Sequence, residues 1–197
     1  MAHSSALLKL STPLVLLLLL HFPPTLASRD APASSDDLVR SSCVHASYPD
    51  ICVRTLSTYP DPPKTKRELA QASVKVSLGR ARKLSEYLAE QREESSKRRE
   101  KAALKDCLEQ MGDSIDELER TLSELEHLRE GSFRFQMSNA ETWVSAALSD
   151  DETCLDGLSE AAGKGRVRDE VKKRIVGVAK VTSNALYLIN QLDSKRG

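Results

Sequence analysis

Four cysteines are the residues of this chain whose type and spacing most clearly indicate chemistry. Cys43 and Cys52 lie close together, whereas Cys107 and Cys154 follow much later in the chain. A zinc site would be expected to contain a Cys-x-x-Cys pair, which is missing, and only His45 lies nearby. An even number of cysteines is typical of paired thiols in an exported protein. We therefore expect two disulfides and no metal, with three pairings possible at this point.

Histidines and carboxylates do not form a recognisable catalytic set. His45 and His127 are the two histidines beyond residue 27, and no sequence pattern joins either one to a reactive serine or cysteine. Carboxylates recur at Glu109, Asp113 and Asp116, but the Glu-x-x-His pairs of a di-iron bundle are missing. We therefore expect no enzyme activity and no cofactor. The acidic run is either a solvated helix face or an acidic contact surface.

Residues 1–27 contain the parts of a secretory signal peptide. Lys9 precedes the apolar run Leu14–Leu20, and the small-residue site Thr25–Ala27 follows it. The run is shorter than the ~20 apolar residues of a membrane span, so we expect cleavage after Ala27 rather than an uncleaved anchor. Residues 28–197 contain 28 basic and 29 acidic residues, a balance that argues against nucleic acid and anionic membranes as partners. The sequence therefore predicts a secreted, extracellular protein.

A short helical hairpin is expected at residues 36–63, after a flexible lead-in at residues 28–35. Asp36 is expected to cap the first helix, and Pro49 suits the first turn of the second helix. Cys43 and Cys52 then lie on opposite arms, at a spacing that a hairpin can close. So small a hairpin buries few apolar residues and would depend on such a covalent link.

Residues 64–197 are expected to form four long helices, because no proline follows Pro63. Apolar residues recur there at steps of three and four, which is typical of helices that pack at shallow angles. The expected inward positions are Leu69, Val76, Leu78, Ala81, Leu84 and Leu88 in the first segment; Leu104, Leu108, Met111, Ile115, Leu118, Leu122 and Leu125 in the second; Ala140, Trp143, Val144, Ala147 and Leu148 in the third; and Val171, Ile175, Val178, Thr182, Ala185, Ile189 and Leu192 in the fourth. The sequence therefore predicts an all-α fold, an up-and-down four-helix bundle that carries an N-terminal helical hairpin.

Local signals suggest where these helices begin and end. The first is expected to run over residues 66–92, and Gly131 is expected to end the second. Ser138–Glu141 has the pattern of a capping box that opens the third helix, and Ser149–Glu152 has the same pattern. We therefore expect the third helix to break or kink before Cys154.

This arrangement favours one pairing of the cysteines over the other two. Cys107 and Cys154 would lie on neighbouring antiparallel helices, where a bridge can join them. Cys43 and Cys52 would then close the hairpin. The other two pairings would tie the hairpin to the bundle twice and are less economical.

Several motifs resemble those of the plant invertase and pectin methylesterase inhibitors. They are Cys43 followed by Tyr48-Pro49, Cys52 and Leu56; Asp106-Cys107-Leu108 with Asp116-Glu117-Leu118; Trp143–Leu148 with Thr153–Gly157; and Thr182–Leu186. The resemblance extends in order from Cys43 to Leu192. It implies a four-helix bundle with an N-terminal hairpin, and the disulfides Cys43–Cys52 and Cys107–Cys154. It also implies a monomeric extracellular inhibitor that binds its target enzyme one to one.

The same resemblance implies which enzyme is the target. Inhibitors of pectin methylesterase lay bundle helices across the substrate cleft of the enzyme, and their Thr-Cys-x-Asp motif matches Thr153–Asp156. Thr153 and Asp156 are therefore candidate contact residues, or residues that cap and brace the bundle. The acidic residues added to this tentative interface are Glu109, Asp113 and Asp116.

Inhibitors of acid invertase use a Pro-Lys-Phe loop that aligns with Phe133-Arg134-Phe135. The proline is missing here, and an arginine replaces the lysine. The chain is therefore expected to inhibit pectin methylesterase, with acid invertase as the alternative target. A secreted helical ligand-binding or signalling bundle is the alternative of another class.

Overall fold

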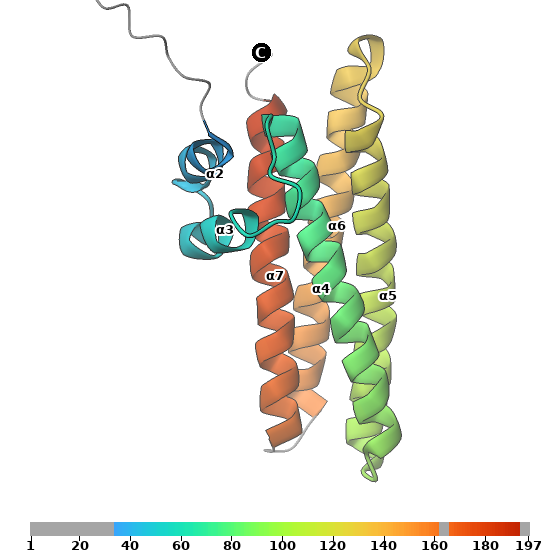
Figure 1. Ribbon diagram of the computed structural model, residues 1–197. Coiled ribbons are helices and arrows are strands. Elements are labelled where there is room, and N and C mark those ends of the chain that lie inside the picture. The colour runs from blue at the N-terminus through green and yellow to red at the C-terminus, as the bar shows by residue number, and fades with distance from the viewer. Residues whose placement is uncertain (1–33, 162–165, 194–197) are drawn as a thin grey trace, which may run out of the picture. The chain divides into compact units, whose positions relative to one another are not determined.

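The computed structural model describes residues 34–161 and 166–193, and every regular element in these residues is a helix. Helices α2 (Ser35–Cys43) and α3 (Pro49–Leu56) form the hairpin. The bundle contains α4 (Lys66–Glu94), α5 (Arg98–Glu126), the 3-10 helix η2 (Glu130–Ser132), α6 (Phe133–Ala161) and α7 (Arg166–Asp193) (Figure 1). The predicted all-α class is confirmed. The predicted signal peptide and residues 28–33 of the lead-in lie outside the described residues.

The hairpin begins at a capping box that the sequence analysis missed. The Ser34 hydroxyl accepts a hydrogen bond from the backbone N–H of Asp37 at 3.1 Å, and the Asp37 carboxylate accepts one from the backbone N–H of Ser34 at 3.2 Å. Asp36 was therefore wrongly predicted as the cap. It accepts a hydrogen bond from the Ser57 hydroxyl at 2.8 Å instead, which ties the start of α2 to the end of α3.

Two amide side chains of α7 fix the hairpin against the bundle. The Asn184 amide is 3% exposed; its oxygen accepts from the Tyr48 backbone N–H at 2.9 Å, and its nitrogen donates to the Tyr48 carbonyl at 3.0 Å. Gln191 donates to the Ser42 carbonyl at 3.0 Å. Asn184 thus supplies an acceptor for the Tyr48 N–H, and it shares the Tyr48 carbonyl with the Cys52 N–H of α3, which donates to the same oxygen at 2.9 Å.

Both disulfides of the predicted fold are present. Cys43–Cys52 joins the two hairpin helices with a Cα–Cα distance of 5.7 Å, and Cys107–Cys154 joins α5 to α6 with a Cα–Cα distance of 4.5 Å. All four cysteine sulfur atoms therefore lie in disulfides.

The core lies along the axis of the bundle, where the predicted seam of α7 is buried from Val171 to Ile189 and only Leu192 is half-buried. On α5, the positions Leu104, Met111, Leu118 and Leu125 are buried as predicted. The other half of that seam is wrong: Leu108, Ile115 and Leu122 are half-buried, whereas Cys107, Ser114 and Thr121 are buried. Since α5 packs against both α4 and α6, its buried stripe is wider than a two-position seam.

Helix α6 differs from the prediction at its start and in its middle. It begins at Phe133, five residues before Ser138, and it continues without a break through Ser149 and Cys154. The hydroxyl of Ser149 donates to the Ser145 carbonyl at 3.1 Å, as hydroxyls inside a helix do, so the two capping-box patterns are not caps.

The turn before α6 is closed by a buried glutamine. Gln136 accepts from the Arg129 backbone N–H and from the Ser132 hydroxyl, both at 2.9 Å, and donates to the His127 carbonyl at 2.9 Å. Helix α5 therefore ends at Glu126, and the prediction that Gly131 ends it is wrong.

Candidate interaction surface

Charge is distributed unevenly over the four bundle helices. The sequences of α5 and α6 contain 15 acidic and 6 basic residues, whereas α4 and α7 contain 8 acidic and 13 basic residues. Neighbouring helices α5 and α6 lie side by side in Figure 1 and make the most extensive contact in the bundle. An acidic surface therefore follows the line where these two helices meet.

We call this line the α5–α6 seam surface and define it by residues that follow one another at helical spacing. They are Asp106, Gln110, Asp113 and Glu117 on α5, and Asp150 and Thr153 on α6. Steps of three and four keep the residues of each helix on the side that faces the neighbouring helix. Near the disulfide the surface is hollowed into a groove of about 310 Å³, lined in part by Asp106, Gln110, Thr153 and Gly157.

Only some of the predicted interface residues belong to this surface. Thr153 lines the groove, and its hydroxyl donates to the Ser149 carbonyl at 2.8 Å, so its side chain is held by its own helix. Asp113 lies beside Glu117 and Asp150. Glu109, Asp116 and Asp156 are exposed and, by helical spacing, face outward from the bundle. Glu109 is also paired with Lys105 at 3.1 Å.

Two carboxyl groups meet in the middle of the seam surface, and the sequence analysis did not identify them as a pair. Glu117 and Asp150 are half-buried and hydrogen-bonded to each other. Burial, this hydrogen bond and the charges of Asp150 and Asp113 raise the pKa of Glu117 to about 7, and burial raises the pKa of Asp150. Oε2 of Glu117 is buried without a hydrogen-bond partner. The two carboxyl groups therefore take up a proton more readily than exposed carboxyl groups do.

Asp151, the next residue on α6, points into the core. It is completely buried, and its two carboxyl oxygens accept hydrogen bonds from Ser114 of α5 at 3.1 Å and Thr182 of α7 at 3.2 Å. Burial raises the pKa of Asp151 to about 7 although both hydrogen bonds act in the opposite direction. A carboxyl group thus links three helices behind the seam surface, and it is uncharged in acidic solution.

The far end of the seam surface is closed by an aromatic contact. The guanidinium of Arg120 on α5 lies 4.9 Å from the ring centre of Trp143 on α6. Trp143 is half-buried. The only tryptophan of the chain therefore packs α5 against α6, as a cation–π partner of the neighbouring helix.

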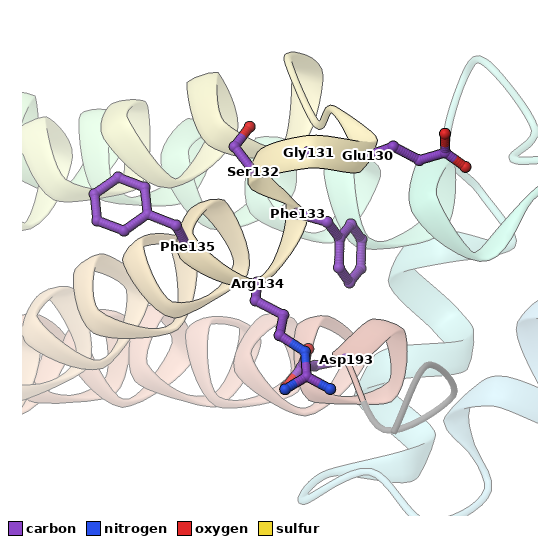
Figure 2. A pocket seen from close by; sticks show the side chains of 7 residues that line it. All are labelled: Glu130, Gly131, Ser132, Phe133, Arg134, Phe135 and Asp193. Atoms are coloured by element: carbon purple, nitrogen blue, oxygen red, sulfur yellow. The ribbon is translucent and has the colours of Figure 1, made fainter.

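A second hollow lies at the start of α6, where Phe133, Arg134 and Phe135 line a cavity of about 690 Å³ together with Asp193 of α7. Figure 2 shows that the two phenylalanine rings point in different directions, while Arg134 reaches toward Asp193. Phe135 is 70% exposed, which is unusual for so large an apolar side chain. This tip contains the Phe133-Arg134-Phe135 stretch that the sequence analysis singled out.

The residues with catalytic potential remain apart. His45 and His127 are exposed on different elements, and His127 contacts the Ser123 carbonyl at 2.7 Å within its own helix. In residues 34–161 and 166–193, no three His, Cys, Asp or Glu side chains are grouped as metal ligands. No helix in these residues has the length and hydropathy of a membrane span.

Comparison with known proteins identifies relatives over most of the chain. Residues 37–188 match the family described as plant invertase/pectin methylesterase inhibitor. The chain is 54% identical over 170 residues to "Pectinesterase inhibitor 3" of Arabidopsis thaliana, an alignment that covers 83% of the chain and 82% of the relative. It is 42% identical over 172 residues to "Pectinesterase inhibitor 9" of the same species, with 83% and 84% covered.

A solved structure agrees with the fold. The crystal structure of a mutant form of a pectin methylesterase inhibitor from Arabidopsis matches with a TM-score of 0.62 at 21% identity, covering 75% of this chain and 92% of that chain. At this level of identity, the match concerns the arrangement of the helices.

Proposed function

The chain belongs to the plant invertase/pectin methylesterase inhibitor family, and from this premise we propose that it is a secreted inhibitor of pectin methylesterase. It has no catalytic activity of its own, needs no cofactor, and acts outside the cell after its signal peptide is removed. It binds the enzyme as a monomer, one to one, and covers the substrate cleft.

The observation that carries this proposal is the 54% identity to a pectinesterase inhibitor over four-fifths of the chain. The α5–α6 seam surface supports it with a physical reason. Two long helices joined by a disulfide form a rigid surface, so little conformational entropy is lost when a partner binds. The groove beside Thr153 can receive a side chain of the enzyme.

We propose Thr153, Asp156, Glu109, Asp113 and Asp116 as contact residues. Thr153 lies in the groove and contributes shape, while the four carboxylates occupy exposed positions of α5 and α6 outside the groove lining. Charges at the edge of an interface mainly set orientation and the rate of association, whereas a packed group near its centre sets affinity. Thr153 is therefore expected to matter more than any single carboxylate.

Acid invertase is the alternative target, and one observation favours it. Phe135 is 70% exposed at the tip where the invertase-directed loop of the family aligns. An enzyme that accepted this ring would bind the end of the bundle instead of the α5–α6 seam surface. The two targets thus require different parts of the chain.

The experiment that tests the proposal is a titration of the purified, oxidised protein against a plant pectin methylesterase and an acid invertase in parallel. We expect pectin methylesterase activity to fall linearly to a break at equimolar inhibitor, while invertase activity is unchanged. Loss of invertase activity alone would replace the proposed target by the alternative. No loss in either assay would refute inhibition.

Two substitutions sharpen the titration. Thr153→Arg places a long charged side chain in the groove, and we expect inhibition to weaken by at least about thirtyfold, the effect of a residue at the centre of an interface. Phe135→Ala changes the exposed tip and should alter inhibition of pectin methylesterase by less than about twofold. Both positions are exposed, so both variants are expected to fold. The opposite ranking would move the interface to the tip.

A further inference from the structure

The basic side of the bundle carries a feature that enzyme inhibition does not use. Helices α4 and α7 contain 13 basic and 8 acidic residues. They lie side by side, with α3 against both of them (Figure 1). The net charge of the chain gives no sign of this basic side, because the excess of acidic residues on α5 and α6 offsets the excess of basic residues on α4 and α7.

A groove of about 250 Å³ runs between α4 and α7 at the centre of this side. It is lined by Arg80, Lys83, Leu84, Arg174, Gly177 and Val178, none of which is acidic. Arg80 is half-buried and donates to the Gly177 carbonyl at 3.2 Å, which holds its guanidinium in the groove. Lys83 is exposed and forms no ion pair with a residue in the described ranges. We call this feature the basic groove.

Two further charged residues lie beside the basic groove, Arg54 of α3 and Glu170 of α7. Burial and the positive charge of Arg54 on α3 lower the pKa of Arg80. A second positive charge therefore lies near the Arg80 guanidinium. Arg174 pairs with Glu170 at 3.0 Å, the one carboxylate that an ion pair brings to these residues. A bound anion would therefore relieve repulsion between arginine and lysine side chains that already lie together.

Aromatic rings lie beside Arg174 of the basic groove and beside Lys180, a further cation of α7 outside the groove lining. The Arg174 guanidinium lies 4.0 Å from the ring centre of Tyr87, and the Lys180 ammonium lies 5.2 Å from that of Tyr48. Arg174 and Lys180 are six residues apart on α7, or about 9 Å along the helix. Cations spread along α4 and α7, within the basic groove and beyond it, suit a polymer with repeated negative charges better than they suit a small ion.

We propose that the basic groove binds a linear polyuronate, the de-esterified form of pectin, through its carboxylates. The choice of this polyanion rests on the proposed function, since hydrolysis of pectin methyl esters leaves a chain of carboxylates where the target enzyme works. The groove lies between α4 and α7, and the α5–α6 seam surface lies between the other two helices. The protein therefore holds the product of the enzyme on one side and the enzyme on the other.

The test is co-sedimentation of the folded protein with insoluble polygalacturonate, compared with fully methyl-esterified pectin as the uncharged form of the same polymer. We expect binding to polygalacturonate that weakens steeply with added salt, and none to the methyl-esterified form. The double variant Lys83→Gln with Arg174→Gln should bind about tenfold more weakly, since two charge contacts are lost. Arg98→Gln with Lys101→Gln removes the same charge from exposed positions of α5 and should change binding less than about twofold.

Three results would overturn the proposal: equal loss of binding in both double variants, equal binding to the esterified polymer, or equal binding to a sulfated polysaccharide or DNA. Equal loss in both double variants would show that the polymer is attracted by the overall positive charge and not by the basic groove. Equal binding to a sulfated polysaccharide or DNA would show that the surface accepts any polyanion. No enzyme is present in this assay, so its result is independent of the inhibition titration. The variants of the basic groove should also inhibit pectin methylesterase as strongly as the unchanged protein.

Discussion

The α5–α6 pair and the α4–α7 pair hold the same bundle together by different means. Helices α5 and α6 have an excess of acidic residues, yet they approach to a Cα–Cα distance of 4.5 Å at the Cys107–Cys154 bridge. Helices α4 and α7 have no such bridge and are joined by polar contacts such as Arg80 to the Gly177 carbonyl. The two pairs therefore differ both in the sign of their excess charge and in the way that they are joined.

The α5–α6 pair and the α4–α7 pair also differ in the ionisable groups that lie between their helices. Between α5 and α6, the pKa of Glu117 is raised to about 7 by burial and by Asp150, and Asp151 is buried behind them with its pKa raised to about 7 by burial. Between α4 and α7, the groove is lined by Arg80, Lys83 and Arg174 and by no carboxylate of the described residues. Carboxyl groups with a pKa raised to about 7 therefore lie on the α5–α6 side of the bundle, and none in the described ranges lines the groove on the other side.

The largest expected effect comes from removing the bridge between α5 and α6. Replacing Cys107 and Cys154 by alanine should lower the free energy of unfolding by about 4 kcal/mol, because the unfolded chain regains the freedom of a long loop. Replacing Cys43 and Cys52 should cost about 2.5–3 kcal/mol, because their loop is short. Urea unfolding of both double variants measures the difference.

The comparison fails if removing the Cys43–Cys52 disulfide lowers the free energy of unfolding more than removing the Cys107–Cys154 disulfide does. It also fails if the α5–α6 variant loses no more stability in low salt than in high salt. Salt screens repulsion between exposed carboxylates, so adding it should recover part of the stability of that variant.

The next effect concerns Asp151 and pH. Its pKa is raised in the folded state, so its contribution is fully present below the unfolded pKa of about 3.8 and is lost as pH rises toward about 7. Asp151→Asn removes this titration, and the unchanged protein should lose on the order of 2–4 kcal/mol across that range relative to the variant. Thermal unfolding across the pH range measures it.

Asp116→Asn is the matched control, since it removes a carboxylate from an exposed position of α5. Its stability should follow that of the unchanged protein at each pH. Parallel curves for the unchanged protein and Asp151→Asn would mean that Asp151 does not carry the pH sensitivity of the α5–α6 pair.

Much of the fold was predictable from sequence because it depends on local patterns. The steps of three and four from Val171 to Ile189 predicted the buried face of α7, and the absence of proline after Pro63 allowed the long helices. The errors arose where a pattern has two meanings. Ser149–Glu152 can open a helix or lie inside one, and packing of α6 against α5 decides which.

The surface was less predictable, because it depends on how far each helix slides along its neighbour. Glu117 and Asp150 are 33 positions apart in sequence, and only the register of α5 against α6 brings them together. Asp151 gives no sign of burial in sequence, since it lies in the acidic run Asp150-Asp151-Glu152. Its spacing from Ala147 and Cys154, four residues before it and three after it, is the signal that could have found it.

The smallest expected effect concerns inhibition, and it compares acidic residues on α5 with acidic residues on α4. Asp113→Asn with Asp116→Asn should weaken inhibition of pectin methylesterase by about tenfold, because two carboxylates of the proposed interface lose their charge. Glu86→Gln with Glu90→Gln removes the same charge from exposed positions of α4 and should change inhibition by less than about twofold. The inhibition constant of each double variant, measured at one pH and one salt concentration, gives the comparison. If both double variants weaken inhibition equally, the enzyme responds to the total charge of the inhibitor, and the acidic side formed by α5 and α6 has no special part in recognition.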